Sequence, residues 1–407
     1  MNHMVGRRIV SGEGWVGPTG TGRAVWSVPA AWGNFSTDVG SLYSRPNNGV
    51  RRSRPLVLLL IPLLAALFAP ELLPMRPSSA AQRFFFEGRT ESHGQLTKPI
   101  LSDGSFSLMT YNVHGLPWPV VSGRADAMEK IGARLAALRL LGKAPQVVVL
   151  QEAFIGEARM IGFRGGYQYS AIGPSSDDRR PADDRNASEP RSLLKGEWSR
   201  PWVSSGLMIL SDFALSDVRM LPFAAGACSG YDCLANKGML SARLSVPGLK
   251  YPVEIVTTHL NSNRASGQSE AVTRRAYKEQ LDALGKWIDR IGSPKGISIV
   301  AGDFNVGHSW PRLSIFLQHL RRWNVQEVTA MGRPQYAALC RSREQDCTGR
   351  NVIPANVPLV HTTDWQFYRA PADVRIEPVS RSVLFGPDRE GQMLSDHVGY
   401  SVRYRIG

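Results

Sequence analysis

The sequence predicts an α/β fold, large enough for one two-sheet domain or two smaller ones. Three short runs are largely apolar and rich in β-branched residues, as in strands buried on both faces: Val147–Val149, Val253–Val256 and Ile297–Val300. Two longer segments, Arg124–Leu141 and Ser269–Ile291, repeat apolar residues at helical spacing and so predict helices with one face in a core. The chain has 407 residues, 43% of them hydrophobic, which is enough for such a core.

The other elements follow from the same two periodicities. Phe106–Val113 alternates as a half-buried strand and leads into the stiff loop His114–Pro119. Ser170–Trp202 is crowded with Asp, Arg, Pro and Ser, which predicts a mobile surface insertion. A helix over Pro311–Trp323 begins with proline near its first turn. Further strands are expected at Gln146–Gln151, Ser205–Leu210, Met239–Val246, Val253–Thr258, Ile297–Asn305, His361–Tyr368, Arg375–Leu384 and Val398–Arg405.

The first 81 residues have the composition of an export segment. Arg51–Arg54 is basic, Leu56–Ala69 is apolar apart from Pro62, and small residues follow at Pro77–Gln82, which predicts a secretory signal with a membrane anchor as the alternative. Residues 1–49 lack periodicity and are expected to be a disordered extension or a mis-assigned start, with synthesis beginning at Val50. The expected organisation is therefore 1–49 as that extension, 50–81 as signal or anchor, 82–104 as linker and 105–407 as the globular domain. Such a protein would be secreted, or periplasmic in the cell envelope.

Charge and cysteine spacing limit the partners and the compartment. The net charge is +14, and residues 82–407 keep a surplus of nine, with 40 Lys and Arg against 31 Asp and Glu. This surplus favours an anionic partner such as nucleic acid, a membrane surface or a phosphoester, although a solvated basic surface explains any single Arg equally well. The four cysteines form two close pairs, Cys228/Cys233 and Cys340/Cys347. Two short-loop disulfides are the simplest pairing in an exported protein, and zinc binding is the weaker alternative.

Polar residues follow the ends of the predicted strands. Asp303 and Asn305 stand two residues apart after Ile297–Val300, so they would project together from the carboxyl edge of a buried sheet. Comparable positions at strand edges are taken by Asn112, Glu152, His259 and the pair Asp396-His397. Carboxylate, amide and imidazole groups bind hard cations and move protons at a phosphate. The pattern therefore indicates a site at one edge of the sheet.

Each of these residues also has a structural alternative. Asp303 and Asn305 could serve a turn, and Glu152 could be a carboxylate at the start of a helix over Ala153–Ile161. A histidine such as His259 is often a satisfied core residue. The agreement of five separated motifs favours one shared site over five separate explanations.

Five motifs occur in the order found in the endonuclease/exonuclease/phosphatase superfamily, which the chain resembles from about Ser105 to Tyr404. They are Thr110-Tyr111-Asn112-Val113, Leu150-Gln151-Glu152, Thr258-His259-Leu260, Gly302-Asp303-Phe304-Asn305 and Ser395-Asp396-His397. The resemblance implies two packed mixed β-sheets flanked by helices, a four-layer α/β/β/α sandwich of the DNase I type. It also implies that residues 105–407 are a catalytic domain that hydrolyses phosphodiesters with Mg²⁺, or with Mn²⁺ or Co²⁺.

The resemblance further implies a metal side to the site. Asn112 and Glu152 would hold the cation, and Gln151 would help to place them. Asp396 would help to hold the metal or His259. A carboxylate at the end of a buried strand suits a Mg²⁺ site, because burial is costly for an unpaired charge.

The remaining residues would handle protons and phosphate. His397, oriented by Asp364, would act as the general base. Asp303 would orient the attacking water or handle the leaving-group proton. His259 and Asn305 would donate hydrogen bonds to the phosphoryl oxygens.

The segment Asp232-x4-Lys237-Gly238 indicates the substrate. It resembles an element of neutral sphingomyelinases, in which these two residues bind substrate: Lys237 would counter the charge of the phosphate, and Asp232 would hold or release Lys237 by ion pairing. The alternative is a loop closed by Cys228/Cys233 with a surface ion pair of little weight.

The expected substrate is sphingomyelin or a related phospholipid, from which a monomeric enzyme would release the phosphorylated head group. The apolar edge Leu116–Val121 could contact a membrane, but the stretch from Asp364 to Asp396 holds no Trp-rich hairpin such as some bacterial relatives use for docking. A secreted Mg²⁺-dependent nuclease is the enzymatic alternative, favoured by the positive charge. A non-catalytic lipid- or receptor-binding module is the alternative from a different class.

Overall fold

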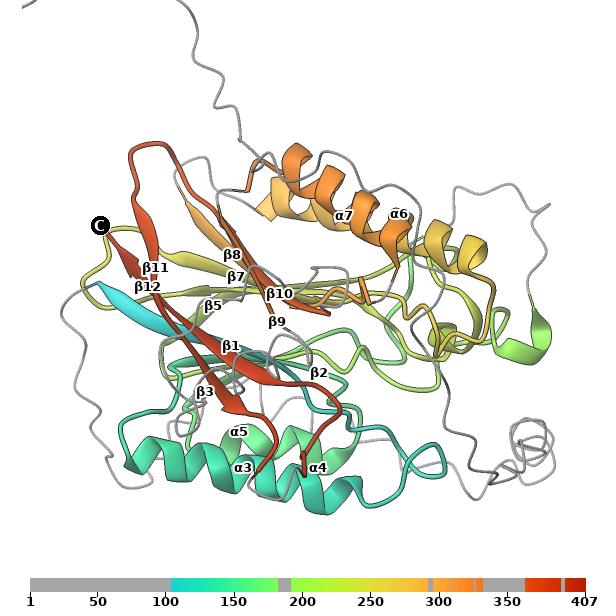
Figure 1. The fold of residues 1–407 in the computed structure, drawn as a ribbon, viewed down its shortest axis with the longest axis horizontal. Coiled ribbons are helices and arrows are strands. Elements are labelled where there is room, and N and C mark those ends of the chain that lie inside the picture. The colour runs from blue at the N-terminus through green and yellow to red at the C-terminus, as the bar shows by residue number, and fades with distance from the viewer. Residues whose placement is uncertain are drawn as a thin grey trace, which may run out of the picture. The chain divides into compact units, whose positions relative to one another are not determined.

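Two mixed β-sheets of six strands each form the centre of the structure, a computed structural model. It describes residues 104–181, 192–291, 296–307, 309–325, 363–388 and 392–407, and the backbone of 327–331. All of them belong to one compact unit, Phe68–Gly407. The sheets pack against each other and helices cover their outer faces (Figure 1). The predicted four-layer α/β/β/α sandwich is confirmed.

The first sheet has the strand order β11-β12-β1-β2-β4-β3. Its strands are β1 (Ser105–Asn112), β2 (Val147–Gln151), β3 (Tyr169–Ile172), β4 (Met208–Ser211), β11 (Ile376–Phe385) and β12 (Gly399–Ile406). β1 runs parallel to β2 and antiparallel to β12. β2 is continuously apolar because both of its faces are buried: Val147 and Val149 lie in the core between the sheets, whereas Val148 and Leu150 pack under the helices.

The second sheet has the order β5-β6-β7-β8-β10-β9. Its strands are β5 (Leu215–Pro222), β6 (Gly238–Leu244), β7 (Val253–His259), β8 (Ile297–Asp303), β9 (Glu327–Met331) and β10 (Asp364–Arg369). β8 pairs in parallel with β7 and antiparallel with β10. Gly302 has to be glycine, because a Cβ there would lie 2.2 Å from the carbonyl oxygen of Thr258 on the neighbouring strand.

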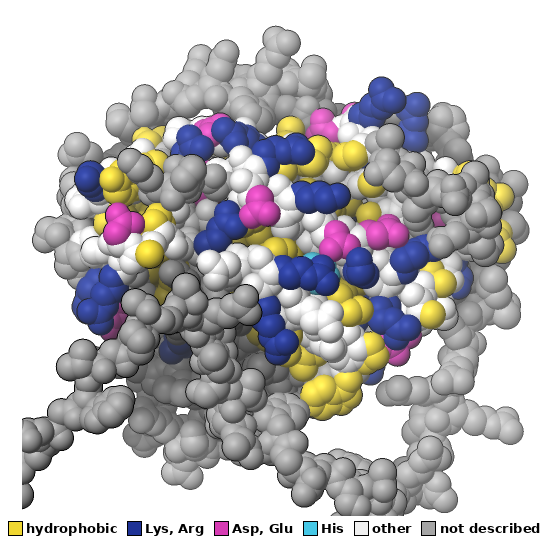
Figure 2. Space-filling view, turned by 90° about the horizontal axis from the view of Figure 1, so that it is seen from above, with side chains coloured by type: hydrophobic (Ala, Val, Ile, Leu, Met, Phe, Trp, Pro, Cys, Tyr) yellow, Lys and Arg dark blue, Asp and Glu magenta, His cyan; other side chains and the backbone are white. Residues whose placement is uncertain are grey.

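Helices cover each outer face. α3 (Arg124–Leu140), α4 (Gly156–Arg159) and α5 (Ile161–Arg164) lie on the first sheet, and α6 (Glu270–Ile291) and α7 (Trp310–Arg322) lie on the second (Figure 1). The three predicted helices are confirmed to within one residue at each end. The view from above in Figure 2, toward the face covered by α6 and α7, shows basic and acidic side chains interspersed. The exposed residues of α6 include Lys278 and Lys286. Its buried stripe packs against the sheet, as predicted.

Two predictions from sequence need correction. The segment Ser170–Trp202, predicted as a surface insertion, contributes most of edge strand β3, which starts at Tyr169, and the short 3₁₀ helix η1 (Leu193–Lys195). The strand predicted at Ser205–Leu210 is Met208–Ser211. β3 has only four residues, and β5 alternates half-buried with exposed residues because both are edge strands, so neither has the apolar run of a central strand.

The Cys228–Cys233 disulfide is confirmed, so zinc binding by this pair is excluded. The pair Cys340/Cys347, the proposed signal at 50–81 and the extension 1–49 lie outside the described residues. Within the described ranges, no helix has the length and apolar content needed to cross a membrane.

Candidate active site

The ends of several strands meet at one edge of the sandwich, toward the right of Figure 1. Asp303, the last residue of β8, lies opposite His259 of β7 on one side and opposite Asp364 of β10 on the other. In the first sheet, Asn112 ends β1 opposite Gln151 of β2. Parallel strands that end together bring these side chains to the same edge.

Contacts between the two sheets close this edge. The amide nitrogen Nδ2 of Asn112 donates to Glu152 Oε1 and to Asp303 Oδ2, both at 3.0 Å. Gln151 Nε2 donates to Thr257 Oγ1 of β7 at 3.2 Å, so it joins the sheets beneath the site. Asn112 therefore holds two carboxylates that are 151 residues apart in sequence.

Asp303 lies at the centre of the cluster and is fully buried. Its Oδ2 is 3.5 Å from His259 Nε2 and 3.7 Å from His397 Nε2. Burial raises the pKa of Asp303 to about 7, since it outweighs the opposing effect of His397. The negative charge of Asp364 acts in the same direction as burial.

This pKa gives a prediction for Asp303→Asn. The unfolded carboxyl ionises from about pH 3.8 and the folded one only near pH 7, so the folded state binds more protons in between and stability falls as pH rises through this window. An amide of the same shape carries no such penalty. We expect the melting temperature of the metal-free protein to rise by roughly 2–8 °C at pH 8 and to change little at pH 4, measured by calorimetry, with turnover lost. A lower melting temperature of the variant at pH 8 would contradict the raised pKa of Asp303.

His397 and Asp364 form a buried pair. His397 Nδ1 lies 2.8 Å from Asp364 Oδ2, which also accepts a hydrogen bond from Thr363 Oγ1 at 2.8 Å. Burial opposes protonation, but the charges of Asp364 and Asp303 outweigh it and hold the pKa of His397 well above its ordinary value. Ser395 Oγ fixes the backbone here, accepting from His397 N at 3.1 Å.

Glu152 follows β2 in an unusual conformation. Its φ of 55° lies in the left-handed region, and it precedes α4 rather than starting a helix, so the helix-terminus alternative is wrong. Oε1 is held by Asn112, whereas Oε2 is buried and finds no hydrogen-bond partner among the described residues. A buried carboxylate oxygen without a partner fits a cation site.

Two groups of side chains in this cluster could hold a metal ion. Asp303, Asp364 and His397 offer ligand atoms within 4.8 Å of one another. However, Asp364 Oδ2 already binds His397 Nδ1, so this pair is better suited to moving a proton. Glu152 and Asp303 are the carboxylates that a cation could join, because both contact the same nitrogen of Asn112.

The other two predicted ligands are placed differently. Asn112 Oδ1 accepts from His114 N at 3.0 Å, so in this arrangement the amide positions the carboxylates. The side chain of Asp396 is 53% exposed and lies 3.4 Å from His114 Nδ1, at the rim. Metal binding by Asn112 and Asp396 remains a prediction.

The residues predicted to bind substrate lie around His259, which is itself next to Asp303. Lys237 Nζ is 3.2 Å from His259 Nε2 and 3.2 Å from Asp232 Oδ1, and it donates to Leu260 O at 3.0 Å. Asp232 also accepts from the backbone of Ser262. Burial, with the charges of Lys237 and His397, holds the pKa of His259 well below its ordinary value, so the imidazole is neutral. The surface ion-pair alternative is wrong for Lys237 and Asp232, since both are largely buried.

Asn305 is held in a fixed orientation. Its φ is 46°, its N–H donates to Asp303 Oδ1 at 2.9 Å and its Nδ2 donates to Leu260 O at 2.9 Å. Three of the positive-φ residues other than glycine, His114, Glu152 and Asn305, are in this region. Such strain persists where surrounding contacts impose it, as at functional sites.

Two arginines that support the site were not predicted from the sequence, the buried Arg312 and the half-buried Arg180. Arg312 donates to Asn261 O at 2.6 Å and to Asn305 O at 3.0 Å, and its guanidinium lies over the ring of Tyr277. Its spacing of four residues from Phe316, on the buried face of α7, was the available signal.

The second is Arg180, from the segment predicted as a surface insertion. It donates to Cys233 O at 2.8 Å and Ala235 O at 2.9 Å, and burial lowers its pKa to about 10. It thus holds the loop that carries Asp232 and Lys237. Nothing in its Asp- and Arg-rich sequence context indicated these contacts.

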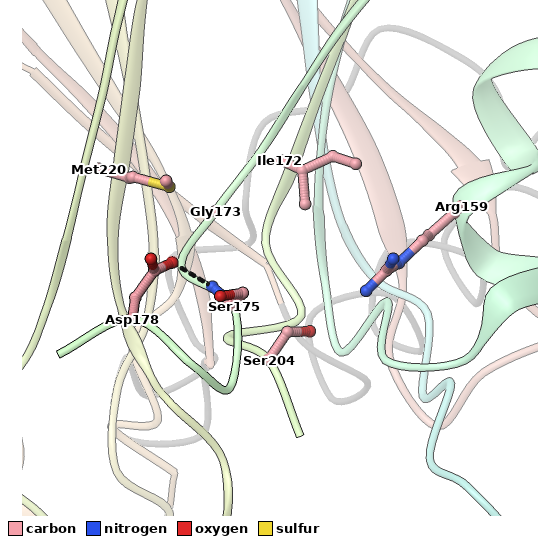
Figure 3. Close-up of a pocket in the computed structure, with 7 residues that line it drawn as sticks. All are labelled: Arg159, Ile172, Gly173, Ser175, Asp178, Ser204 and Met220. Carbon is pink, nitrogen blue, oxygen red and sulfur yellow. Dashed lines mark hydrogen bonds between the residues drawn. The ribbon is translucent and has the colours of Figure 1, made fainter. Parts of the chain in front are cut away.

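A separate cavity of about 130 Å³ has a different lining (Figure 3). Arg159 points into it from α4, and Asp178 accepts from Ser175 N at 2.7 Å across from it. None of the predicted site residues is among the described residues that line it. The polar cluster around Asp303 is therefore identified by its contacts and not by this cavity.

A family model described as the endonuclease/exonuclease/phosphatase family matches residues 109–397, more than half of the chain. The chain belongs to this family. All five motifs that carry the resemblance fall within the matched range, and the fold of the family is the one described above. No curated protein matches this family member in a sequence comparison.

Solved structures similar to this family member share the fold at low identity. Sphingomyelinase C from Streptomyces griseocarneus is 19% identical with a TM-score of 0.48, covering 74% of this chain and 99% of its own. A beta toxin mutant from Staphylococcus aureus with bound magnesium ions is 19% identical with a TM-score of 0.48, covering 73% and 99%. TDP2 from D. rerio, complexed with a single-strand DNA product, is 16% identical with a TM-score of 0.43, covering 74% and 99%. These likenesses concern the fold and assign no substrate.

Proposed function

We propose that this family member is a Mg²⁺-dependent phosphodiesterase that cleaves a phospholipid and releases its phosphorylated head group. The observation that carries the proposal is the hydrogen bonding of Glu152 and Asp303 to one Asn112 nitrogen, with the Asp364–His397 pair beside them. A cation site and a proton-transfer pair at one edge are the two parts that phosphodiester hydrolysis needs.

The residues of this chain divide the work as follows. His397 Nε2 takes the proton of the attacking water, while Asp364 holds Nδ1 and stabilises the charge that forms. Asp303 Oδ2, 3.7 Å from His397 Nε2, orients that water. Lys237 and the neutral His259 lie on the other side of Asp303, where they meet the phosphoryl oxygens.

The cation would be held by Glu152 and Asp303, with Asn112 and Asp396 as further candidates. Bound there, Mg²⁺ would polarise a phosphoryl oxygen and stabilise charge on the leaving oxygen. Mn²⁺ and Co²⁺ are alternative cations for the same donors. The feature of the structure that supports this placement is Glu152 Oε2, which is buried and has no hydrogen-bond partner among the described residues.

A base at His397 gives a pH prediction. Its neutral form is the active one, so kcat/KM rises as pH increases through its pKa, which the neighbouring carboxylates raise. Asp364→Asn removes the first of these charges, so the acidic limb should move to lower pH while the maximal rate falls by ~10²-fold or more. The measurement is the pH profile of kcat/KM at saturating Mg²⁺. Asp282→Asn, which removes the partner of His319 on α7, is the control and should leave the limb in place.

The substrate class is tested by incubating the purified protein with sphingomyelin vesicles, lysophospholipid and plasmid DNA in parallel, with and without Mg²⁺. Release of phosphocholine without nicking of DNA supports the lipid enzyme. Nicking without phosphocholine release would instead identify a nuclease, for which the positive charge is the supporting observation. No hydrolysis of any substrate would favour the non-catalytic binding module.

Export is part of the proposal, based on Arg51–Arg54 and the apolar run Leu56–Ala69. N-terminal sequencing of the mature protein from the growth medium or cell envelope tests it. A mature terminus close to Gln82 would support a cleaved signal. Recovery of peptides from residues 1–49 would contradict the proposed start at Val50.

A further inference from the structure

Large apolar side chains project into solvent from a short segment close to the candidate site. Within residues 192–203, here called the 192–203 ridge, Leu193, Leu194, Trp198 and Trp202 are 76%, 74%, 60% and 58% exposed. Single exposed apolar residues are ordinary on a protein surface, whereas four within ten residues form a cluster typical of an interaction site.

The ridge is tied to the loop that carries the substrate-side residues. Glu197 Oε1 accepts from Gly230 N at 2.6 Å and from Gln268 Nε2 at 2.7 Å. Trp202 N donates to Leu234 O at 2.7 Å, and Asn236 N donates to the carbonyl of Val203 at 3.0 Å. These contacts hold the apolar side chains outward, next to the segment that contains Asp232 and Lys237.

A second apolar loop belongs to the same edge. Residues 116–121, here called the Trp118 loop, begin four residues after Asn112, the last residue of β1, and Trp118 and Val120 are 76% and 61% exposed. In Figure 1 this loop and η1 both lie toward the right, where β1, β7 and β8 end. Exposed apolar side chains therefore lie beside both sheets, at the edge that carries the candidate site.

The charges of the ridge indicate what covers it. Its one acidic residue, Glu197, is engaged by three hydrogen-bond donors of the protein. Arg200 is exposed between Trp198 and Trp202, and Lys195 donates to the neutral Gln268. Trp and Leu beside Arg and Lys are the composition that enters the interface of a bilayer with negatively charged lipids.

We infer that the 192–203 ridge and the Trp118 loop seat the protein on a bilayer that contains anionic phospholipid, with the catalytic edge toward the lipid phosphates. The inference rests on the proposed function, since an enzyme that acts on a soluble substrate does not need to bind a membrane. Separate side chains on loops fit the disordered interface of a bilayer, whereas a protein partner requires an extended complementary surface.

A matched pair of double variants tests the inference in the full chain. Leu193→Asp with Leu194→Asp changes the ridge. Leu140→Asp with Leu141→Asp changes two leucines of similar exposure, 76% and 69%, at the end of α3. That end is roughly 25 Å along the helix from its start at the catalytic edge. Both variants keep residues 50–81, so any membrane binding by that segment is common to them.

The probe is vesicles of equal parts phosphatidylcholine and phosphatidylglycerol. Co-sedimentation measures binding to the vesicles, and amide hydrogen exchange is followed in residues 192–203. The ridge variant should bind about 10-fold or more weakly than the wild type, and the α3 variant like the wild type. Exchange in residues 192–203 should slow on vesicles in the wild type. Equal binding by the two variants, or unchanged exchange in residues 192–203, would overturn the inference.

Catalysis is followed separately with bis(p-nitrophenyl) phosphate, a soluble diester. Its hydrolysis should be equal in the wild type and both variants, since neither pair of leucines belongs to the site. Absence of hydrolysis in all three would count against the proposed function, whereas vesicle binding is read without turnover. The two failures are therefore distinguishable.

Discussion

Replacing His397 by alanine is expected to reduce turnover by ~10²–10⁴-fold while the domain stays folded. The imidazole is the side chain of the site whose Nε2 faces Asp303 while Nδ1 is held by Asp364. Its removal takes away the group that accepts the proton from water. Initial rates on the best substrate at saturating Mg²⁺, with circular dichroism to check folding, measure the effect.

The structure offers a matched control for this variant. His319 is also buried and pairs with an aspartate, since its Nε2 is 2.9 Å from Asp282 Oδ1, but it lies on α7 away from the strand ends. His319→Ala should destabilise the fold by about 1–3 kcal/mol and leave turnover of the folded protein unchanged. Equal turnover in the His397 and His319 variants would remove the assigned base.

Glu152→Gln is expected to raise the Mg²⁺ concentration required for half-maximal activity by roughly 10–100-fold. Glutamine keeps the size of the side chain and one acceptor oxygen, but it loses the negative charge that a hard cation requires. A Mg²⁺ titration of initial rates measures the shift. The maximal rate should recover in part at high Mg²⁺, because Asp303 remains.

Glu254 provides the control for this substitution. It is buried on β7, its Oε2 accepts from Arg243 Nε at 3.1 Å, and one of its oxygens also lacks a hydrogen-bond partner among the described residues. Glu254→Gln should therefore leave the Mg²⁺ requirement unchanged. A similar shift in both variants would mean that general destabilisation, rather than loss of a ligand, explains the result.

The parts of the fold that sequence predicted are those in which burial imposes a repeat. β2 and β8 are buried on both faces, and α3 and α6 carry one long apolar stripe, so their patterns are unmistakable. Edge strands β3 and β5 lack this constraint, because each pairs with a neighbouring strand on one side only. Their existence is decided by pairing with β4 and β6, which no local pattern records.

The candidate site, like the fold, could be predicted from the sequence only in part. Strand ends in the sequence predicted which residues meet, because parallel strands deliver their last residues to one edge. The orientation of Asn112 could not be predicted, since it is set by contacts to His114 and to carboxylates on different strands. The roles of Arg180 and Arg312 could not be predicted for a related reason: both donate to backbone carbonyls that only the tertiary fold brings close.

Hydrolysis by the wild-type protein after removal of metal with EDTA, followed by addition of Mg²⁺, tests the central claim most directly. If Glu152 and Asp303 hold a cation beside the His397 base, phosphodiester cleavage should disappear in EDTA and return when Mg²⁺ is supplied. Full turnover of the EDTA-treated protein would contradict a metal-dependent site at this edge of the sandwich.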